Sequence, residues 1–234
     1  MISHEHKTVF IHVPKVAGQS VELAFLRQLG MTWEERAPLV LRHNPDPAKG
    51  PERLAHLLAR EYVALGYIDQ PTFDSYFKFA FVRNPWARLV SEYEYRRRET
   101  RPFAEFVAAE FADIDGYSDH SRHIIPQSDY LYDADGQLMV DFVGRFETIA
   151  RDFRQVSDRL DLGVEELPHK NVSGMSRLQK LFRRKPKEKK PYQDYYDAGL
   201  RDRVGEFYQQ DVERFGYSFD GSFRDEPIAR GLQA

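Results

Sequence analysis

The chain has 234 residues, of which 41% are hydrophobic and 30% charged, with 17 Phe and 13 Tyr, and this excludes a disordered or low-complexity protein. It contains no Cys, so a disulfide framework, a thiolate nucleophile and a cysteine-ligated metal centre are excluded as well. The formal net charge of −3 gives no overall attraction to nucleic acid, and we expect no nucleic-acid partner. We predict a single domain over residues 1–234, with its core at about residues 7–217.

The apolar runs of the sequence are short. None reaches the roughly 7–15 residues of a signal peptide or the about 20 residues of a membrane span. We therefore expect a cytoplasmic protein without a transmembrane segment.

Two strand–loop–helix units are predicted in the first hundred residues. The first has a β-branched and aromatic run at 7–13, a loop at 14–20 and helical spacing of apolar residues from Val21 to Leu29. A helix is predicted at 52–65, followed by an almost wholly apolar strand at 77–83, after which Asn84-Pro85 begins a helix that runs to Tyr95. Such units predict an α/β fold of the P-loop-like kind, in which a central parallel sheet is flanked by helices in three layers.

The second half of the chain adds one more buried strand. Helices are predicted at 103–111, 147–160 and 192–215, a hairpin at 130–138 that turns at Asp135-Gly136, and the strand at 140–146. The segment 168–191 lacks hydrophobic periodicity and is predicted to be a loop. Within it, residues 177–191 form a basic loop, since eight basic residues and one acidic residue lie between Arg177 and Lys190. This loop could attract an anionic ligand, make peripheral contact with a membrane or be a solvated charge run.

The loop at 14–20 has the composition of an anion site. It joins a strand to a helix N-terminus, where free backbone N–H groups and the helix dipole favour negative charge. Lys15 adds a formal charge, Ala17 and Gly18 allow close approach of a ligand, and Ser20 can act as N-cap and hydroxyl donor. The loop is not a Walker A motif, because its Lys precedes the Gly, and an ordinary turn with a solvated Lys15 remains an alternative.

A second anion site is predicted where the next strand ends. Arg83 stands at the carboxyl end of that strand and Ser91 lies two turns into the following helix. In a parallel α/β sheet this edge forms the ligand crevice, and a guanidinium can hold a phosphate with two hydrogen bonds. Taken singly, Arg83 could instead pair with an acidic neighbour, and Ser91 could be a surface residue.

Together, the PKxxGxS sequence of the first loop and the RNPxxRLxS sequence of the second resemble the two donor-binding loops of sulfotransferases. Further blocks over about residues 8–217, among them His123-Ile-Ile-Pro-Gln127, are similar to those of carbohydrate sulfotransferases that use 3′-phosphoadenosine 5′-phosphosulfate. That group includes the Golgi chondroitin and heparan 2-O enzymes and bacterial relatives. The resemblance implies a carbohydrate or glycoconjugate acceptor and no metal in the chemistry.

The resemblance also implies residue roles. The 5′-phosphosulfate would be held by Lys15, Ala17, Gly18, Gln19 and Ser20, and the 3′-phosphate by Arg83 and Ser91. Asn171 and Ser173 would close over the nucleotide. A positioned Lys and backbone amides suit a loose transition state whose charge gathers on the leaving phosphate.

The base for the acceptor hydroxyl would be a His that precedes the Arg-bearing strand. His43 and His56 meet this condition, and we favour His56, whose position resembles a His block of bacterial relatives. His123 and His169 are further candidates, because imidazole titrates near neutrality. His120 and His123 stand three residues apart beside Asp119, but no third ligand pattern appears, and we expect no metal site.

Two other functions are open from the residues alone. One is a nucleotide or sugar kinase that uses the first loop for ATP. The other is a non-catalytic nucleotide- or polyanion-binding module, in which the basic loop makes the contacts. The acceptor and the oligomeric state are not indicated by the sequence.

Overall fold

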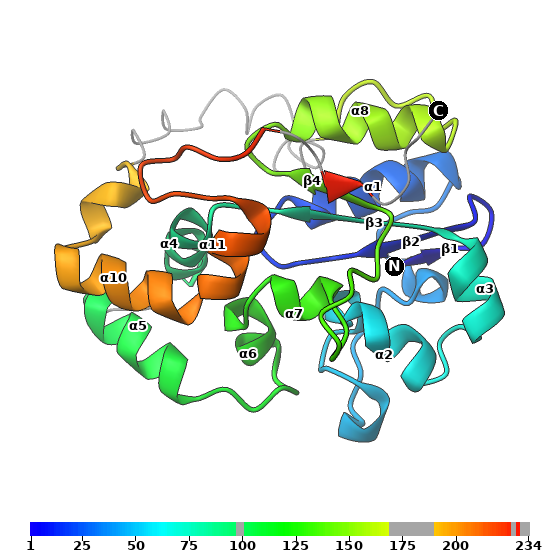
Figure 1. Ribbon diagram of the computed structural model, residues 1–234. Helices are drawn as coiled ribbons and strands as arrows, with labels where there is room; N and C mark the ends of the chain where they lie inside the picture. Colours follow the sequence, from blue (N-terminus) through cyan, green and yellow to red (C-terminus); the bar gives the residue numbers. More distant parts are fainter. Residues whose placement is uncertain (97–100, 169–189, 226–227, 230–234) are drawn as a thin grey trace, which may run out of the picture.

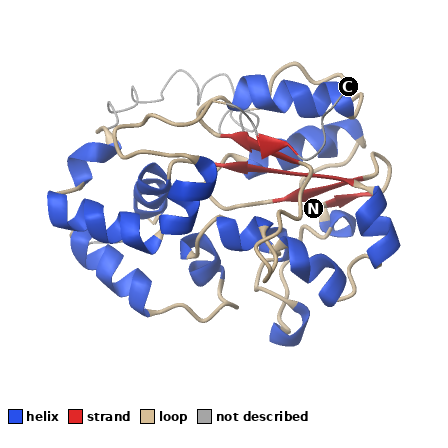
Figure 2. Ribbon diagram, viewed as in Figure 1, coloured by secondary structure: helices blue, strands red, loops and turns tan. Residues whose placement is uncertain are grey.

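A computed structural model describes residues 1–96, 101–168, 190–225 and 228–229, and its centre is a five-stranded sheet in the order β1-β2-β3-β4-β5. The inner strands β2 (Thr8–Ile11), β3 (Phe77–Val82) and β4 (Phe142–Arg145) run parallel. The edge strands β1 (Ile2–Ser3) and β5 (Ile228–Ala229) are antiparallel to their neighbours (Figure 2). Phe10, Phe79 and Phe142 lie side by side in register, and their burial explains why these strands are almost wholly apolar.

Helices cover both faces of this sheet (Figure 1). On one face lie α1 (Gly18–Gln28) and α8 (Ile149–Arg159), and on the other lie α2 (Ala59–Ala64) and α7 (Ser128–Leu131). The remaining helices are α3 (Gln70–Ser75), α4 (Pro85–Tyr95), α5 (Phe103–Ala112), α6 (Asp119–Ile124), α10 (Ala198–Phe207) and α11 (Gln209–Phe215). Short 3₁₀ turns are η1 (Ala37–Leu39), η2 (Pro47–Lys49), η3 (Leu54–His56) and η4 (Tyr192–Tyr195).

The predicted α/β fold is confirmed, including the three inner strands. The helix that follows β3 also begins as predicted, because the Asn84 side chain caps it by accepting a hydrogen bond from the Ala87 N–H at 3.2 Å, with Pro85 at its first position. Among the described residues, no helix is long and apolar enough to span a bilayer.

Three sequence-based boundaries were wrong. The helix predicted at 52–65 is replaced by the extended residue Arg53 (which bridges to His43), the 3₁₀ turn η3 and the short helix α2. In place of the single helix predicted at 192–215, the chain forms η4, α10 and α11. These breaks were not predicted, because apolar residues recur at helical spacing across them. The predicted hairpin at 130–138 is reduced to one bridge between Tyr132 and Leu138, because Tyr130 and Leu131 belong to α7. The helices α3 and α6 were missed.

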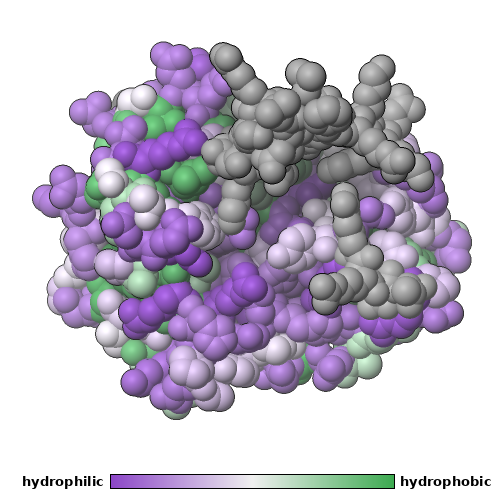
Figure 3. All heavy atoms as spheres, turned by 180° about the vertical axis from the view of Figure 1, so that it is seen from behind, coloured by the Kyte–Doolittle hydropathy of each residue, from purple (hydrophilic) through white to green (hydrophobic). Residues whose placement is uncertain are grey.

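Two apolar clusters stabilise this architecture. The larger surrounds the sheet, and the smaller joins α4 to α5 and α10 around Trp86, Phe106 and Tyr208. Because α4 is clamped by the smaller cluster, the residues at both of its ends have fixed positions relative to the sheet. Seen from behind, relative to Figure 1, the surface is mostly hydrophilic, with smaller apolar groups between the polar side chains (Figure 3).

Candidate active site

The two predicted anion loops meet at the carboxyl edge of the parallel strands. The Arg83 guanidinium donates a hydrogen bond to the Lys15 carbonyl at 3.3 Å, although the residues are far apart in the sequence. The Gln127 side chain fixes Arg83 by accepting from its N–H at 2.9 Å and donating to its carbonyl at 2.8 Å. Gln127 is in turn held by the buried carboxylate of Asp211. The positions of the two loops are therefore coupled.

The first loop has an unusual backbone. Lys15 and Ala17 both adopt left-handed conformations, with φ of 70° and 66°, which are costly for residues with a Cβ and occur most often at functional sites. The buried Arg88 side chain supports this loop by donating to the Pro14 carbonyl at 3.3 Å, while its other nitrogens donate to the carbonyls of His123 and Ile125.

The helix after this loop begins without a side-chain cap. Its N-cap residue is Ala17, which makes no side-chain cap hydrogen bond. The prediction that Ser20 is the N-cap was wrong, because α1 starts at Gly18 and Ser20 already lies within it. An uncapped N-terminus fits an anionic ligand, since backbone N–H groups and the dipole are directed toward the loop.

Gly18 is required by a neighbouring side chain. A Cβ built at Gly18 would lie 2.0 Å from Nε2 of His12, so the imidazole fills the space that any other residue would need. His12 is buried at the end of β2, and its Nδ1 contacts the Glu22 carboxylate at 2.6 Å. His12 was not among the candidate residues predicted from the sequence. Its place directly after a buried strand, two residues before the Pro that opens the loop, was the available signal.

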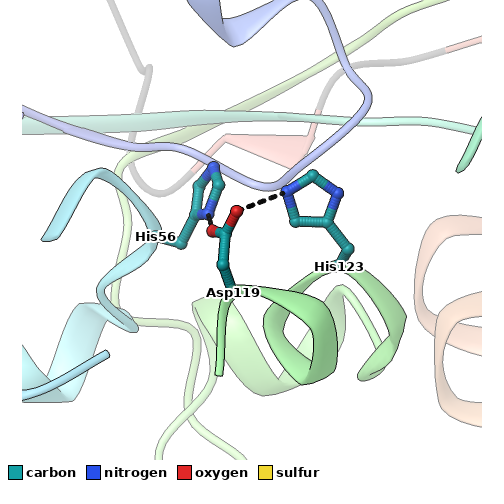
Figure 4. A group of neighbouring side chains, drawn as sticks. All are labelled: His56, Asp119 and His123. Atoms are coloured by element: carbon teal, nitrogen blue, oxygen red, sulfur yellow. Dashed lines mark hydrogen bonds and ion pairs between the residues drawn. The ribbon is translucent and has the colours of Figure 1, made fainter. Parts of the chain in front are cut away.

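His12 begins a row of three imidazoles. The rings of His12 and His56 have centroids 5.0 Å apart, and the rings of His56 and His123 are also 5.0 Å apart, both pairs edge to face. Each ring places its Nδ1 on a different carboxylate: His12 on Glu22, His56 on Asp119 at 2.7 Å, and His123 on Glu92 at 2.6 Å. Figure 4 shows His56 arriving from its 3₁₀ turn above α6, which carries both Asp119 and His123.

The protonation states of this row follow from burial. Burial lowers the pKa of His56 to about 4, because the charged ring would be desolvated and would face His123 and His12, while its hydrogen bond to Asp119 opposes the shift. Burial alone would raise the pKa of Asp119, but the hydrogen bond from His56 and the charges of neighbouring side chains, Arg53 among them, together outweigh it and lower the pKa. At neutral pH His56 is therefore a neutral imidazole whose Nδ1–H donates to an ionised carboxylate, which leaves the lone pair on Nε2.

Glu92 connects this row to the first loop. Its carboxylate accepts from His123 and from Arg96, each at 2.6 Å, and one of its oxygens lies 4.0 Å from the Lys15 ammonium. Burial would raise the pKa of Glu92, but these hydrogen bonds and charges hold it at about 2. The Lys15 ammonium also lies over the Tyr95 ring, 3.7 Å from its centroid. An ionised carboxylate thus faces both the lysine and a histidine.

The remaining predicted residues differ in how far they are buried. Gln19 is exposed at the start of α1, while Ser91 is half-buried on α4, one residue before Glu92. Arg83 is half-buried against the Phe146 ring, and burial lowers the pKa of its guanidinium. The imidazole of His43 is 63% exposed and contacts Glu52, apart from the buried row. Asn171, Ser173 and His169 lie outside the described residues, as do residues 177–189 of the basic loop.

Comparison with known proteins identifies the family. A model of the sulfotransferase family matches residues 1–218. The chain belongs to the sulfotransferase family. An uncharacterized protein of Archaeoglobus fulgidus is 30% identical over 102 residues, which are 42% of this chain and 78% of that protein. No solved structure matches the chain.

Membership in this family implies two chemical tasks. A sulfotransferase must stabilise an anionic donor and remove a proton from its acceptor. The edge of the sheet described above brings Lys15, Arg83 and the N-terminus of α1 close to a row of imidazoles.

Proposed function

We propose that this sulfotransferase moves a sulfuryl group from 3′-phosphoadenosine 5′-phosphosulfate to a hydroxyl group of a carbohydrate or glycoconjugate. The observation that carries the proposal is the hydrogen bond from Arg83 to the Lys15 carbonyl, which brings the two anion-binding loops to one place. A donor with phosphates at both its 5′ and 3′ positions would engage both loops at once.

The donor supplies the sulfuryl group and leaves as adenosine 3′,5′-bisphosphate. Lys15, the N–H groups of Gly18 and Gln19 and the Ser20 hydroxyl stabilise the negative charge that develops on the 5′-phosphate as the sulfur–oxygen bond to it breaks. Arg83 and Ser91 hold the remote 3′-phosphate and orient the nucleotide, which discriminates it from ATP. Asn171 and Ser173 complete this assignment from the family resemblance.

His56 is the proposed base. As the new sulfur–oxygen bond forms, the acceptor hydroxyl gives its proton to Nε2 of His56, while Asp119 holds the opposite N–H and stabilises the imidazolium that results. A ring with a pKa of about 4 is a weak base, but in a loose transition state the acceptor oxygen becomes acidic late, so a neutral, oriented imidazole is sufficient.

A thermal-shift comparison tests the donor. Adenosine 3′,5′-bisphosphate should raise the melting temperature more than ADP or ATP at equal concentration, because only a ligand that binds the folded state stabilises it. Lys15→Ala should reduce this shift. Stronger stabilisation by ADP or ATP would favour a kinase. Equal shifts for the wild type and Lys15→Ala, with binding that falls steeply with salt, would favour a polyanion-binding module.

A further inference from the structure

Among the residues that the structure describes, one nitrogen in the histidine row has no hydrogen-bond partner. Nε2 of His123 is buried without a hydrogen-bond partner, in a side chain that is only 10% exposed. Because Nδ1 of this ring lies 2.6 Å from Glu92, a neutral His123 donates from Nδ1 and keeps a lone pair on Nε2. That lone pair faces a carboxylate oxygen of Asp119 at 3.7 Å. Two electron-rich atoms held face to face in a buried place favour a positive species between them.

A third donor atom adjoins this gap. Asp119 lies between the two rings, and each of the three side chains offers a ligand atom, all within 4.8 Å of one another (Figure 4). The residues come from η3 and from successive turns of α6, so they are held by separate elements. The sequence could not reveal this set, because His56 is 63 residues from Asp119.

We propose that His56, Asp119 and His123 bind a zinc ion. Two imidazole nitrogens and one carboxylate oxygen suit zinc, whereas magnesium and calcium prefer oxygen ligands. Glu92 already orients His123 as the outer carboxylate of a metal-bound histidine does. Arg53, whose Nε lies 3.1 Å from Asp119, has a side chain that is 54% exposed and can turn into solvent when the ion binds.

Zinc at this place would switch off the base, a consequence that rests on the proposed function. Binding through Nδ1 of His56 displaces the proton that this nitrogen now donates to Asp119, so the ring proton is carried on Nε2 instead. Nε2 is the atom that accepts the proton of the acceptor hydroxyl, so the zinc-bound protein cannot use it. Zinc would therefore act as a reversible inhibitor, and removing it with a chelator would restore transfer.

Titration calorimetry on the full chain, freed of metal with a chelator, tests the binding without donor or acceptor. We expect one Zn²⁺ per chain in the wild type and no binding of Mg²⁺. His123→Gln and Asp119→Asn should weaken zinc binding by more than the about 10–100-fold that loss of an outer partner costs. His43→Gln, which removes an exposed imidazole, should bind zinc as the wild type does.

Circular dichroism shows which variants are folded. Either of the two ligand variants is sufficient for the test, provided that it folds. Unchanged zinc affinity in a folded His123→Gln or Asp119→Asn variant would overturn the proposal, as would saturation that His43→Gln abolishes. Absence of saturable binding up to millimolar zinc would mean that a proton, and not a metal, occupies the gap. None of these outcomes depends on whether the chain transfers sulfate, so failure of the zinc site and failure of the proposed function remain distinct.

Discussion

The two ends of the parallel strands use charged residues differently. At the amino end, the buried Lys78 ammonium donates to the carbonyls of Phe73, Asp74 and Tyr76 at 2.7–3.3 Å and lies 3.1 Å from Asp141. Three of these four partners are within five residues of Lys78. An open hollow of about 500 Å³ lies at this end, lined by residues that include Lys7, Asp141 and Arg159.

At the carboxyl end, charged groups join segments that are distant in the sequence. His56 pairs with Asp119, His123 with Glu92, and Arg83 with the Lys15 backbone, and the left-handed residues Lys15 and Ala17 lie in the same place. A hollow and a buried lysine occur at the amino end, so neither feature marks the candidate site. What distinguishes the carboxyl end is its network of long-range polar contacts together with the large pKa shifts of His56 and Glu92, since a left-handed residue, Lys7 with φ of 46°, also lies at the amino end.

The test with the largest expected effect replaces one buried polar residue at each end of the parallel strands. His56→Gln should lower kcat by about 10²–10⁴-fold, because the amide cannot accept the acceptor's proton, while binding of adenosine 3′,5′-bisphosphate stays within a few-fold. Lys78→Met should leave kcat per folded molecule unchanged but destabilise the fold by about 1–3 kcal/mol, since Asp141 loses its buried partner. Sulfate-transfer kinetics and urea unfolding measure the two effects.

Normal turnover in His56→Gln would remove His56 as the base. A loss of turnover in Lys78→Met that persists after correction for the folded fraction would instead show that the two ends are functionally linked.

The sequence predicted the elements of the site better than their contacts. Lys15 and Arg83 could be placed at strand ends because apolar runs stop at Pro14 and at Asn84, and strand ends share an edge. The partners of His56 and His123 could not be predicted. Asp119 lies on α6, a six-residue helix with too few turns to give a periodic signal, and the pairings with Asp119 and Glu92 span loops of no regular pattern.

Gly18 shows a second limit of the sequence. It was interpreted as space for a ligand, but the atom that requires a glycine is in the His12 ring, a contact that no local pattern reveals. The role of Gly18 in donor binding stays a prediction, and the steric requirement is an additional one.

A smaller effect is expected from Gly18→Ala. The new methyl group would meet the His12 ring, which Glu22 holds in place, so we expect a loss of about 1–3 kcal/mol in the free energy of unfolding. Gly205→Ala provides the matched control on α10, where a Cβ would lie 3.0 Å from the Trp86 ring and where no part of the anion loops is affected. Both variants can be compared by urea unfolding, and donor affinity should fall in Gly18→Ala alone.

Equal donor affinity in the two alanine variants would contradict the steric coupling between His12 and the first loop. It would mean that the loop adjusts to the methyl group without changing the helix N-terminus.

The last expected effect is a pH dependence of stability caused by His56. Its pKa is about 4 in the folded chain and about 6.5 for an ordinary histidine, so between these values the unfolded chain binds the proton and the folded chain does not. The free energy of unfolding should therefore rise with pH across this window, by up to about 1.4 kcal/mol per pH unit from this one group.

Glu92, with a pKa near 2, loses its stabilising contribution only as the pH falls from about 4.5 toward 2, which separates its effect from that of His56. His56→Gln should flatten the slope between pH 4.5 and 6.5. If urea unfolding gives the same slope for the wild type and His56→Gln, His56 is not buried in its neutral form, and the orientation of its Nε2 lone pair as a base would lose its physical support.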